Sequence, residues 1–170
     1  MKKLKNILTD KKLSNILFIF TCIVYALVLF RGLLFKYVSF FELFSPDRFE
    51  YIGYNLIPFN GSGVSYRIDL IINTLLFVPF GFLLSMKSKK NLRSLLLMLL
   101  PIAASIMFEG LQYILRLGAA DITDTIMNSA GVCAGFLIYF ISYRIFGNKA
   151  DNFYIIAMSV VAILALIFLY

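Results

Sequence analysis

The chain has 170 residues, of which 61% are hydrophobic and only 15% are charged. Soluble domains are typically about 45–50% apolar, so this composition excludes an ordinary soluble domain and indicates an integral membrane protein. The formal charge of +7 lies at the ends of apolar runs, which favours a role in membrane orientation over nucleic-acid binding.

Five apolar runs are long enough to cross a hydrocarbon core of about 30 Å, which needs roughly 20 helical residues. They predict an all-α integral membrane protein, a single domain over residues 1–170 formed by a bundle of five transmembrane helices. The first run is too long for the apolar core of a cleaved signal peptide and is taken as a retained span. The predicted spans are residues 15–34, 69–86, 92–115, 122–146 and 153–170.

The distribution of basic residues predicts the orientation of the bundle. Eleven Lys and Arg residues precede the first span or follow the second and fourth spans, whereas five lie on the other side. By the positive-inside rule, the N-terminus is cytoplasmic and the C-terminus lies outside. The long loop 35–66, rich in Phe and Tyr, is then extracytoplasmic. It is interpreted as an amphipathic segment in the membrane interface or, alternatively, as a partly re-entrant lid over a site.

Polar side chains enter the membrane on three of the predicted spans. Each set has the spacing i, i+3, i+7, which places its members on one helix face. The sets are Tyr66, Asp69 and Asn73, with Arg67 beside them, then Glu109, Gln112 and Arg116, then Asp121, Asp124 and Asn128. Ionisable residues at such depth cost about 2.5–3.5 kcal/mol each on insertion scales, so we interpret the three faces as walls of one outward-facing polar pocket. The predicted turn 117–120 is short enough to hold the third and fourth spans side by side. The predicted pocket comprises Arg67, Asp69, Asn73, Glu109, Gln112, Arg116, Asp121, Asp124 and Asn128.

The residue types in the pocket suggest several chemistries. Arg67 and Arg116 can bind a carboxylate or phosphate in a bidentate way, and Glu109 is the best candidate for a residue that exchanges a proton. Carboxylates at Glu109, Asp121 and Asp124 suit Mg²⁺, but the spacing alone assigns no metal ligand. Alternatively, these residues have a purely structural role, because buried ion pairs and interhelical amides also hold membrane bundles together. Gly131 and Gly135 are interpreted as helix packing.

Two segments carry a resemblance to a known family. The sequence YRIDLIINTLLFVPFGFLL, followed by FEGLQYILRLGAADITDTIMNSAGVCAG, resembles the VanZ-like family of bacterial membrane proteins. The family pattern has R-x-D-x-x-x-N and F-x-P-x-G-F, then E-x-x-Q, then D-x-x-D-x-x-x-N-x-x-G, and the VanZ-like core is expected over residues 55–146. The resemblance implies a multi-pass protein of the bacterial plasma membrane and low-level resistance to teicoplanin-type glycopeptide antibiotics. It implies no molecular mechanism.

Two functions of different classes fit these observations. The first is a cell-envelope protein whose pocket binds an amphiphile, either a lipid-linked cell-wall precursor or a lipoglycopeptide. In it, the two arginines would hold an anionic head group. The second is a membrane-embedded enzyme that modifies a lipid-linked substrate, with Glu109 as general acid or base and Mg²⁺ as a conceivable aid. The lipid bilayer is a partner in both, and no nucleic acid is expected. Transport is less favoured, because no internal repeat is evident.

Overall fold

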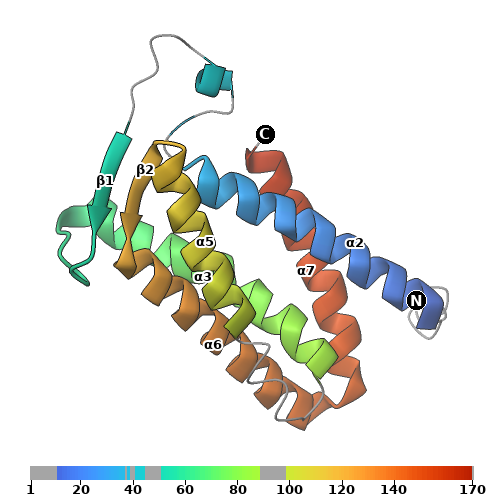
Figure 1. Ribbon diagram of the computed structural model, residues 1–170. Helices are drawn as coiled ribbons and strands as arrows, with labels where there is room; N and C mark the ends of the chain where they lie inside the picture. The colour runs from blue at the N-terminus through green and yellow to red at the C-terminus, as the bar shows by residue number, and fades with distance from the viewer. Residues whose placement is uncertain (1–10, 37, 39–40, 45–50, 89–98, 170) are drawn as a thin grey trace.

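The computed structural model describes residues 11–36, 38, 41–44, 51–88 and 99–169. Within these ranges the chain is mainly helical, and five helices account for most of it (Figure 1). The elements in chain order are α2 (Lys11–Leu29), the π-helical turn η1 (Phe30–Leu34), the 3₁₀ turn η2 (Phe41–Phe44), β1 (Tyr51–Asn55), α3 (Gly63–Ser88), α5 (Leu99–Ile114), β2 (Leu117–Asp121), α6 (Ile122–Phe146) and α7 (Asn148–Leu169).

Four of these helical segments are long and apolar enough to cross a membrane: Leu13–Leu34, Gly63–Met86, Ile122–Phe146 and Asn148–Ile167. They confirm the first, second, fourth and fifth predicted spans as apolar helices. Helix α3, which corresponds to the second predicted span, begins at Gly63, six residues before the predicted start. Helix α7, which corresponds to the fifth, begins at Asn148, five residues before the predicted start. Within the third predicted span the structure has the shorter apolar helix α5, which is not one of the four candidate spans, and the predicted residues 92–98 lie outside the described part of the chain.

The helices run alternately up and down. Figure 1 shows that α2, α5 and α7 end at the same end of the bundle at which α3 and α6 begin, close to the two strands. Helix α3 packs most extensively against α6, and α2 packs against α7. The hydroxyls of Thr21 and Ser159 are hydrogen-bonded at 2.6 Å and join the second of these pairs. The inside and outside assignment of the two ends remains a prediction from the charge distribution.

Glycines permit the close contact between α3 and α6. A Cβ atom on Gly131 would overlap the carbonyl oxygen of Thr74, and one on Gly135 would overlap that of Val78. A Cβ on Gly81, from the opposite helix, would overlap the carbonyl oxygen of Val132. The two backbones therefore touch, which confirms that Gly131 and Gly135 serve helix packing.

The segment predicted as a turn at 117–120 is instead part of strand β2, and this prediction was wrong. Strand β2 pairs in parallel with β1, which lies in the long loop, with Tyr51 opposite Leu117 and Asn55 opposite Asp121. The pairing is parallel because each strand leads into one of the two helices, α3 and α6, that pack side by side. Gly53 faces Ala119, and these small residues allow the close approach. The chain is thus not purely α-helical.

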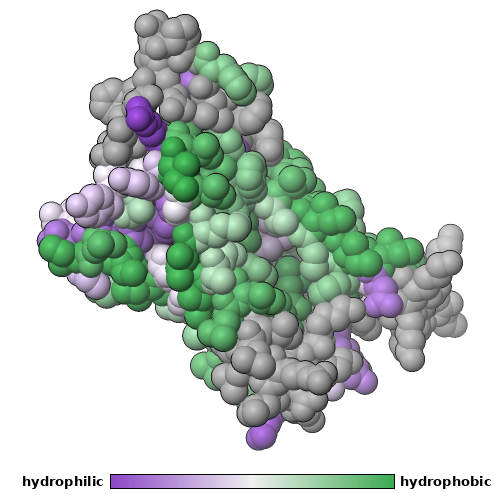
Figure 2. Space-filling model, viewed as in Figure 1, coloured by the Kyte–Doolittle hydropathy of each residue, from purple (hydrophilic) through white to green (hydrophobic). Residues whose placement is uncertain are grey.

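The surface has the polarity expected of a bundle in lipid. Figure 2 shows hydrophobic side chains along the helices of the visible face and hydrophilic ones gathered at the end that carries the strands. Exposed apolar residues are found on all four candidate spans, for example Ile23, Leu75, Ile138 and Leu164. In contrast, Asn73, Gln112 and Asn128 are buried inside the bundle, so the polar residues face inward.

Candidate functional site: a lysine-centred polar network

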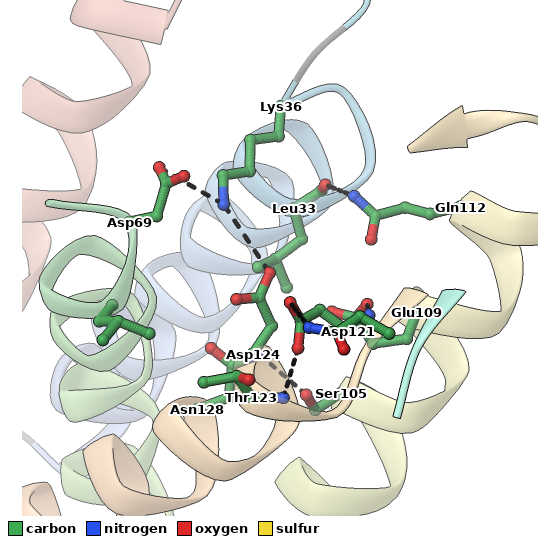
Figure 3. A network of polar contacts seen from close by, with 12 residues as sticks. Leu33, Lys36, Asp69, Ser105, Glu109, Gln112, Asp121, Thr123, Asp124 and Asn128 are labelled. Carbon is green, nitrogen blue, oxygen red and sulfur yellow. Dashed lines mark hydrogen bonds and ion pairs between the residues drawn. The ribbon is translucent and has the colours of Figure 1, made fainter. Parts of the chain in front are cut away.

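Lys36 reaches from the edge of the polar residues toward the aspartates of two helices (Figure 3). Its ammonium nitrogen is 3.5 Å from Oδ1 of Asp69 on α3 and 3.7 Å from Oδ2 of Asp124 on α6. The side chains of Lys36 and Asp124 are only 16% and 19% exposed, so the pair is largely withdrawn from solvent. The lysine follows directly after the first candidate span and thereby links that span to the α3–α6 pair.

Two buried amides lie one helical turn beyond the aspartates. Asn73 follows Asp69 on α3 and lies beside Asp124, while Asn128 follows Asp124 on α6. Asn128 donates a 2.8 Å hydrogen bond from Nδ2 to Ser105 Oγ on α5. Within the described residues, Nδ2 of Asn73 and Oδ1 of Asn128 are both buried without a well-formed hydrogen bond. Such groups are rare in folded proteins and call for an explanation.

Glu109 and Asp121 connect α5 to the start of α6. Oε2 of Glu109 accepts a 2.8 Å hydrogen bond from the backbone N–H of Asp121. The carboxylate of Asp121 in turn caps α6 by accepting from the N–H of Thr123 at 2.7 Å. Its other oxygen accepts from Nδ2 of Asn55 at 3.0 Å, which ties β1 to β2. Asp121 is therefore a helix N-cap as well as a member of the polar set.

Gln112 has a clear structural partner. Its Nε2 donates a 2.7 Å hydrogen bond to the carbonyl oxygen of Leu33 in η1. A π-helical turn leaves carbonyl groups without the usual i→i+4 partner, and the buried amide of Gln112 satisfies one of them. This bond fixes the end of the first span against α5, three residues before Lys36.

The two arginines differ from the other predicted pocket residues. Arg67 is exposed, and its Nε reaches back to the carbonyl oxygen of Gly63 at 3.4 Å. Arg116 is also exposed and has a φ of 55°, in the left-handed region, where the chain turns from α5 into β2. In the described part of the chain, Asp69 and Asp124 both form ion pairs with Lys36. We define the Lys36 network as Lys36, Asp69, Asn73, Glu109, Asp121, Asp124 and Asn128.

Sequence reasoning missed four contributors to this region: Lys36, Asn55, Ser105 and Thr123. Lys36 is one of the five basic residues that the charge distribution places outside, and it belongs to none of the three polar helix faces. Ser105 does offer a signal, since it lies one turn before Glu109 on the same face of α5. Asn55 and Thr123 depend on the strand pairing, which local periodicity does not reveal.

The carboxylates of Glu109, Asp121 and Asp124 are of the type that binds Mg²⁺. Among the described residues, no group of three or more His, Cys, Asp or Glu side chains is arranged to hold a metal ion. Oε2 of Glu109 and Oδ1 of Asp121 accept backbone hydrogen bonds instead.

Apolar spans enclosing a buried polar network define a multi-pass membrane protein. The family model described as VanZ/LLP1 matches residues 18–144. The chain is 31% identical to Protein VanZ of Enterococcus faecium over 127 aligned residues. The aligned region covers 75% of this chain and 77% of that protein. The chain therefore belongs to the VanZ/LLP1 family. No solved structure matches it.

Proposed function

We propose that this protein lowers bacterial susceptibility to teicoplanin-type glycopeptides by binding an amphiphilic or lipid-linked ligand at the Lys36 network. The observation that carries the proposal is the lysine that pairs with Asp69 and Asp124, next to two buried amides that each have one polar atom, Asn73 Nδ2 and Asn128 Oδ1, without a well-formed hydrogen bond among the described residues. A bundle held together by packing alone has no need of these groups, because each costs free energy in a membrane. Similarity to Protein VanZ supplies the link to resistance.

The charges of the network favour a particular head group. The network contains four carboxylates, on Asp69, Glu109, Asp121 and Asp124, and one lysine, which pairs with Asp69 and Asp124. A second cation or a group rich in N–H and O–H donors complements this excess of acceptors, whereas an anionic group would be repelled. A ligand with an amine or several hydroxyl groups therefore fits the network better than a bare phosphate. The exposed positions of Arg67 and Arg116 give no support to a buried phosphate site.

The same end of the bundle is predicted to face the cell exterior. Positive-inside orientation puts the starts of α3 and α6 outside, and the network lies at these starts. A ligand would then reach the network from the outer leaflet, where lipid-linked wall precursors are exposed to glycopeptides. This sidedness is part of the proposal and can be checked by labelling introduced cysteines from outside intact cells.

An enzyme acting on a lipid-linked substrate is the second candidate, and Glu109 would be its acid or base. The contacts of Glu109 favour binding instead, because one of its oxygens accepts the N–H of Asp121 at the N-terminus of α6. A glutamine would preserve that hydrogen bond through its amide oxygen, but it could not exchange a proton. Glu109→Gln should therefore keep most of the protection that Glu109→Ala loses. Equal and complete loss in both variants would favour the enzyme.

The proposed function is tested in a susceptible Gram-positive host. Growth inhibition by teicoplanin and by vancomycin is compared for cells with the protein, without it, and with Glu109→Gln or Glu109→Ala, at matched membrane levels. The proposal expects the wild-type protein to raise the inhibitory concentration of teicoplanin more than that of vancomycin. No change for either drug in cells that insert the protein would refute the proposed function.

A further inference from the structure

A small pocket lies at the opposite end of the bundle from the Lys36 network, between the end of α6 and the start of α7. Figure 1 shows that the chain turns back on itself here, close to the end of α3. The pocket has a volume of about 290 Å³, near the lower end of the range of roughly 300–1,000 Å³ that is typical of ligand pockets. We call it the α6–α7 pocket, and it is lined by Ser142, Phe146, Lys149, Ala150, Phe153 and Tyr154.

The floor of the α6–α7 pocket is rigid and offers a hydrogen-bond donor. Tyr154 is only 8% exposed, and its ring stacks on Phe82 of α3 with the centroids 4.7 Å apart. The hydroxyl oxygens of Tyr154 and Ser142 lie 2.6 Å from each other. Each hydroxyl carries one proton, and only one of the two protons can lie between the oxygens. The other can therefore be donated to an oxygen of a ligand in the pocket.

Lys149 supplies a positive charge at the rim of the pocket. Its side chain is exposed, and it forms none of the ion pairs found among the described residues. Asp151 lies two residues further along α7, and residues two apart do not face each other on a helix. Asp151 also does not line the pocket, and its carboxylate accepts a hydrogen bond from Tyr139. Lys149 is thus positioned to pair with an anion in the pocket.

The walls and the surrounding charges indicate which kind of anion fits. Phe146 and Phe153 are apolar walls that are 61% and 66% exposed, so an occupant with an apolar part would cover them, whereas a free inorganic phosphate would not. The segments after the second and fourth spans contain six basic residues and one acidic residue. Basic pockets between membrane helices on the cytoplasmic side attract the head groups of anionic lipids. Charge and apolar surface together therefore favour a lipid phosphate.

We propose that the α6–α7 pocket binds the head group of an anionic phospholipid. The phosphate oxygens pair with Lys149 and accept a proton from the hydroxyls of Ser142 and Tyr154. The apolar part of the lipid next to the head group lies against Phe146 and Phe153. By the positive-inside rule, this lipid belongs to the cytoplasmic leaflet. The site is separate from the Lys36 network and does not depend on the proposed function.

The test measures lipid binding by the purified full-length protein in a neutral detergent. Phosphatidylglycerol, which is anionic, or phosphatidylethanolamine, which is zwitterionic, is added, and bound lipid is counted by native mass spectrometry. We expect several-fold more bound phosphatidylglycerol, and we expect excess inorganic phosphate to leave it in place. Equal binding of the two lipids would overturn the inference. Full displacement by inorganic phosphate would also overturn it, by showing a site for free phosphate rather than for a lipid.

A matched set of substitutions locates the bound lipid. Lys149→Met should lower phosphatidylglycerol binding several-fold, and Lys149→Arg should restore most of it. Arg144→Met is the control, because Arg144 is another exposed cation at this end but does not line the pocket. Its guanidinium carbon lies 5.1 Å from the ring centroid of Phe140 instead. Arg144→Met should therefore leave binding nearly unchanged. Equal losses in the two methionine variants would indicate general attraction to the basic end of the bundle and would contradict the inference, as would unchanged binding in Lys149→Met.

Discussion

The ammonium nitrogen of Lys36 lies 3.7 Å from Oδ2 of Asp124, although the two residues belong to opposite halves of the chain. The contact joins the segment after the first span to the first turn of α6. Because Lys36 also lies 3.5 Å from Asp69 of α3, one side chain compensates the carboxylates of both central helices. The lysine thus has a structural role that can be measured apart from ligand binding.

Lys36→Met should destabilise the folded bundle. Without the ammonium group, Asp69 and Asp124 lose their shared counter-ion. Asp69 is partly solvated, but leaving the largely buried carboxylate of Asp124 uncompensated should cost about 1–3 kcal/mol or more. Thermal unfolding in detergent micelles measures this effect, and Lys36→Arg should restore most of the stability. Lys149→Met, which removes an exposed cation in the first turn of α7, serves as the control and should have little effect. Equal unfolding temperatures for the two methionine variants would rule out a central role for Lys36.

Asp121→Ala should lower stability through loss of the α6 cap. The carboxylate accepts the N–H of Thr123 and binds Asn55 of β1, and loss of an N-cap costs about 0.5–2 kcal/mol. Asp121→Asn keeps an acceptor for Thr123 and should be less destabilising. Equilibrium unfolding gives the free energy of unfolding of both variants. An alanine variant as stable as the asparagine variant would mean that the cap contributes nothing.

Gly135→Ala should weaken the packing of α3 on α6. The added methyl group would overlap the carbonyl oxygen of Val78, and overpacking of this kind costs typically about 1–3 kcal/mol. Gly110→Ala is the matched control, since a Cβ there meets nothing within 4 Å and alanine favours a helix by roughly 0.5–1 kcal/mol over glycine. Thermal unfolding should therefore shift in opposite directions for the two variants. A shift in the same direction would contradict the close backbone contact.

Arg67→Ala should retain most of the teicoplanin protection. Its guanidinium is exposed and hydrogen-bonds to its own helix at Gly63, outside the Lys36 network. Asp69→Asn, two residues away, removes one carboxylate that pairs with Lys36 and should reduce protection more. The inhibitory concentration of teicoplanin is measured for both at equal membrane levels. Greater loss in Arg67→Ala would restore the sequence-based prediction that the arginines hold the head group.

Hydropathy and helical spacing predicted much of this architecture because both are local properties. Runs of apolar residues predicted the four candidate spans. The i, i+3, i+7 spacing predicted the inward-facing positions of polar residues such as Asn73 and Gln112, which are buried. The packing role of Gly131 and Gly135 followed from a motif only five residues long. In each case the information lies within a few helical turns.

The features that sequence reasoning missed depend on contacts between distant segments. Strand β2 has the sequence Leu-Gly-Ala-Ala-Asp, which has none of the β-branched or aromatic residues that favour strands. It is extended because β1, more than 60 residues earlier, pairs with it. Lys36 follows an irregular turn, so no periodic pattern directs it inward. No sequence spacing links Lys36 to Asp69 and Asp124, the two carboxylates with which it pairs.

The central claim is that the Lys36 network has a function beyond holding the bundle together. Asp124→Asn tests it most directly, because the change removes one charge facing Lys36 while it preserves side-chain size. Teicoplanin inhibition is measured for wild type and variant at equal membrane level and with unfolding temperatures determined for both. The account predicts that protection is lost in a variant that remains folded and inserted. Full protection by a stable Asp124→Asn protein would contradict it and would leave the network a purely structural element.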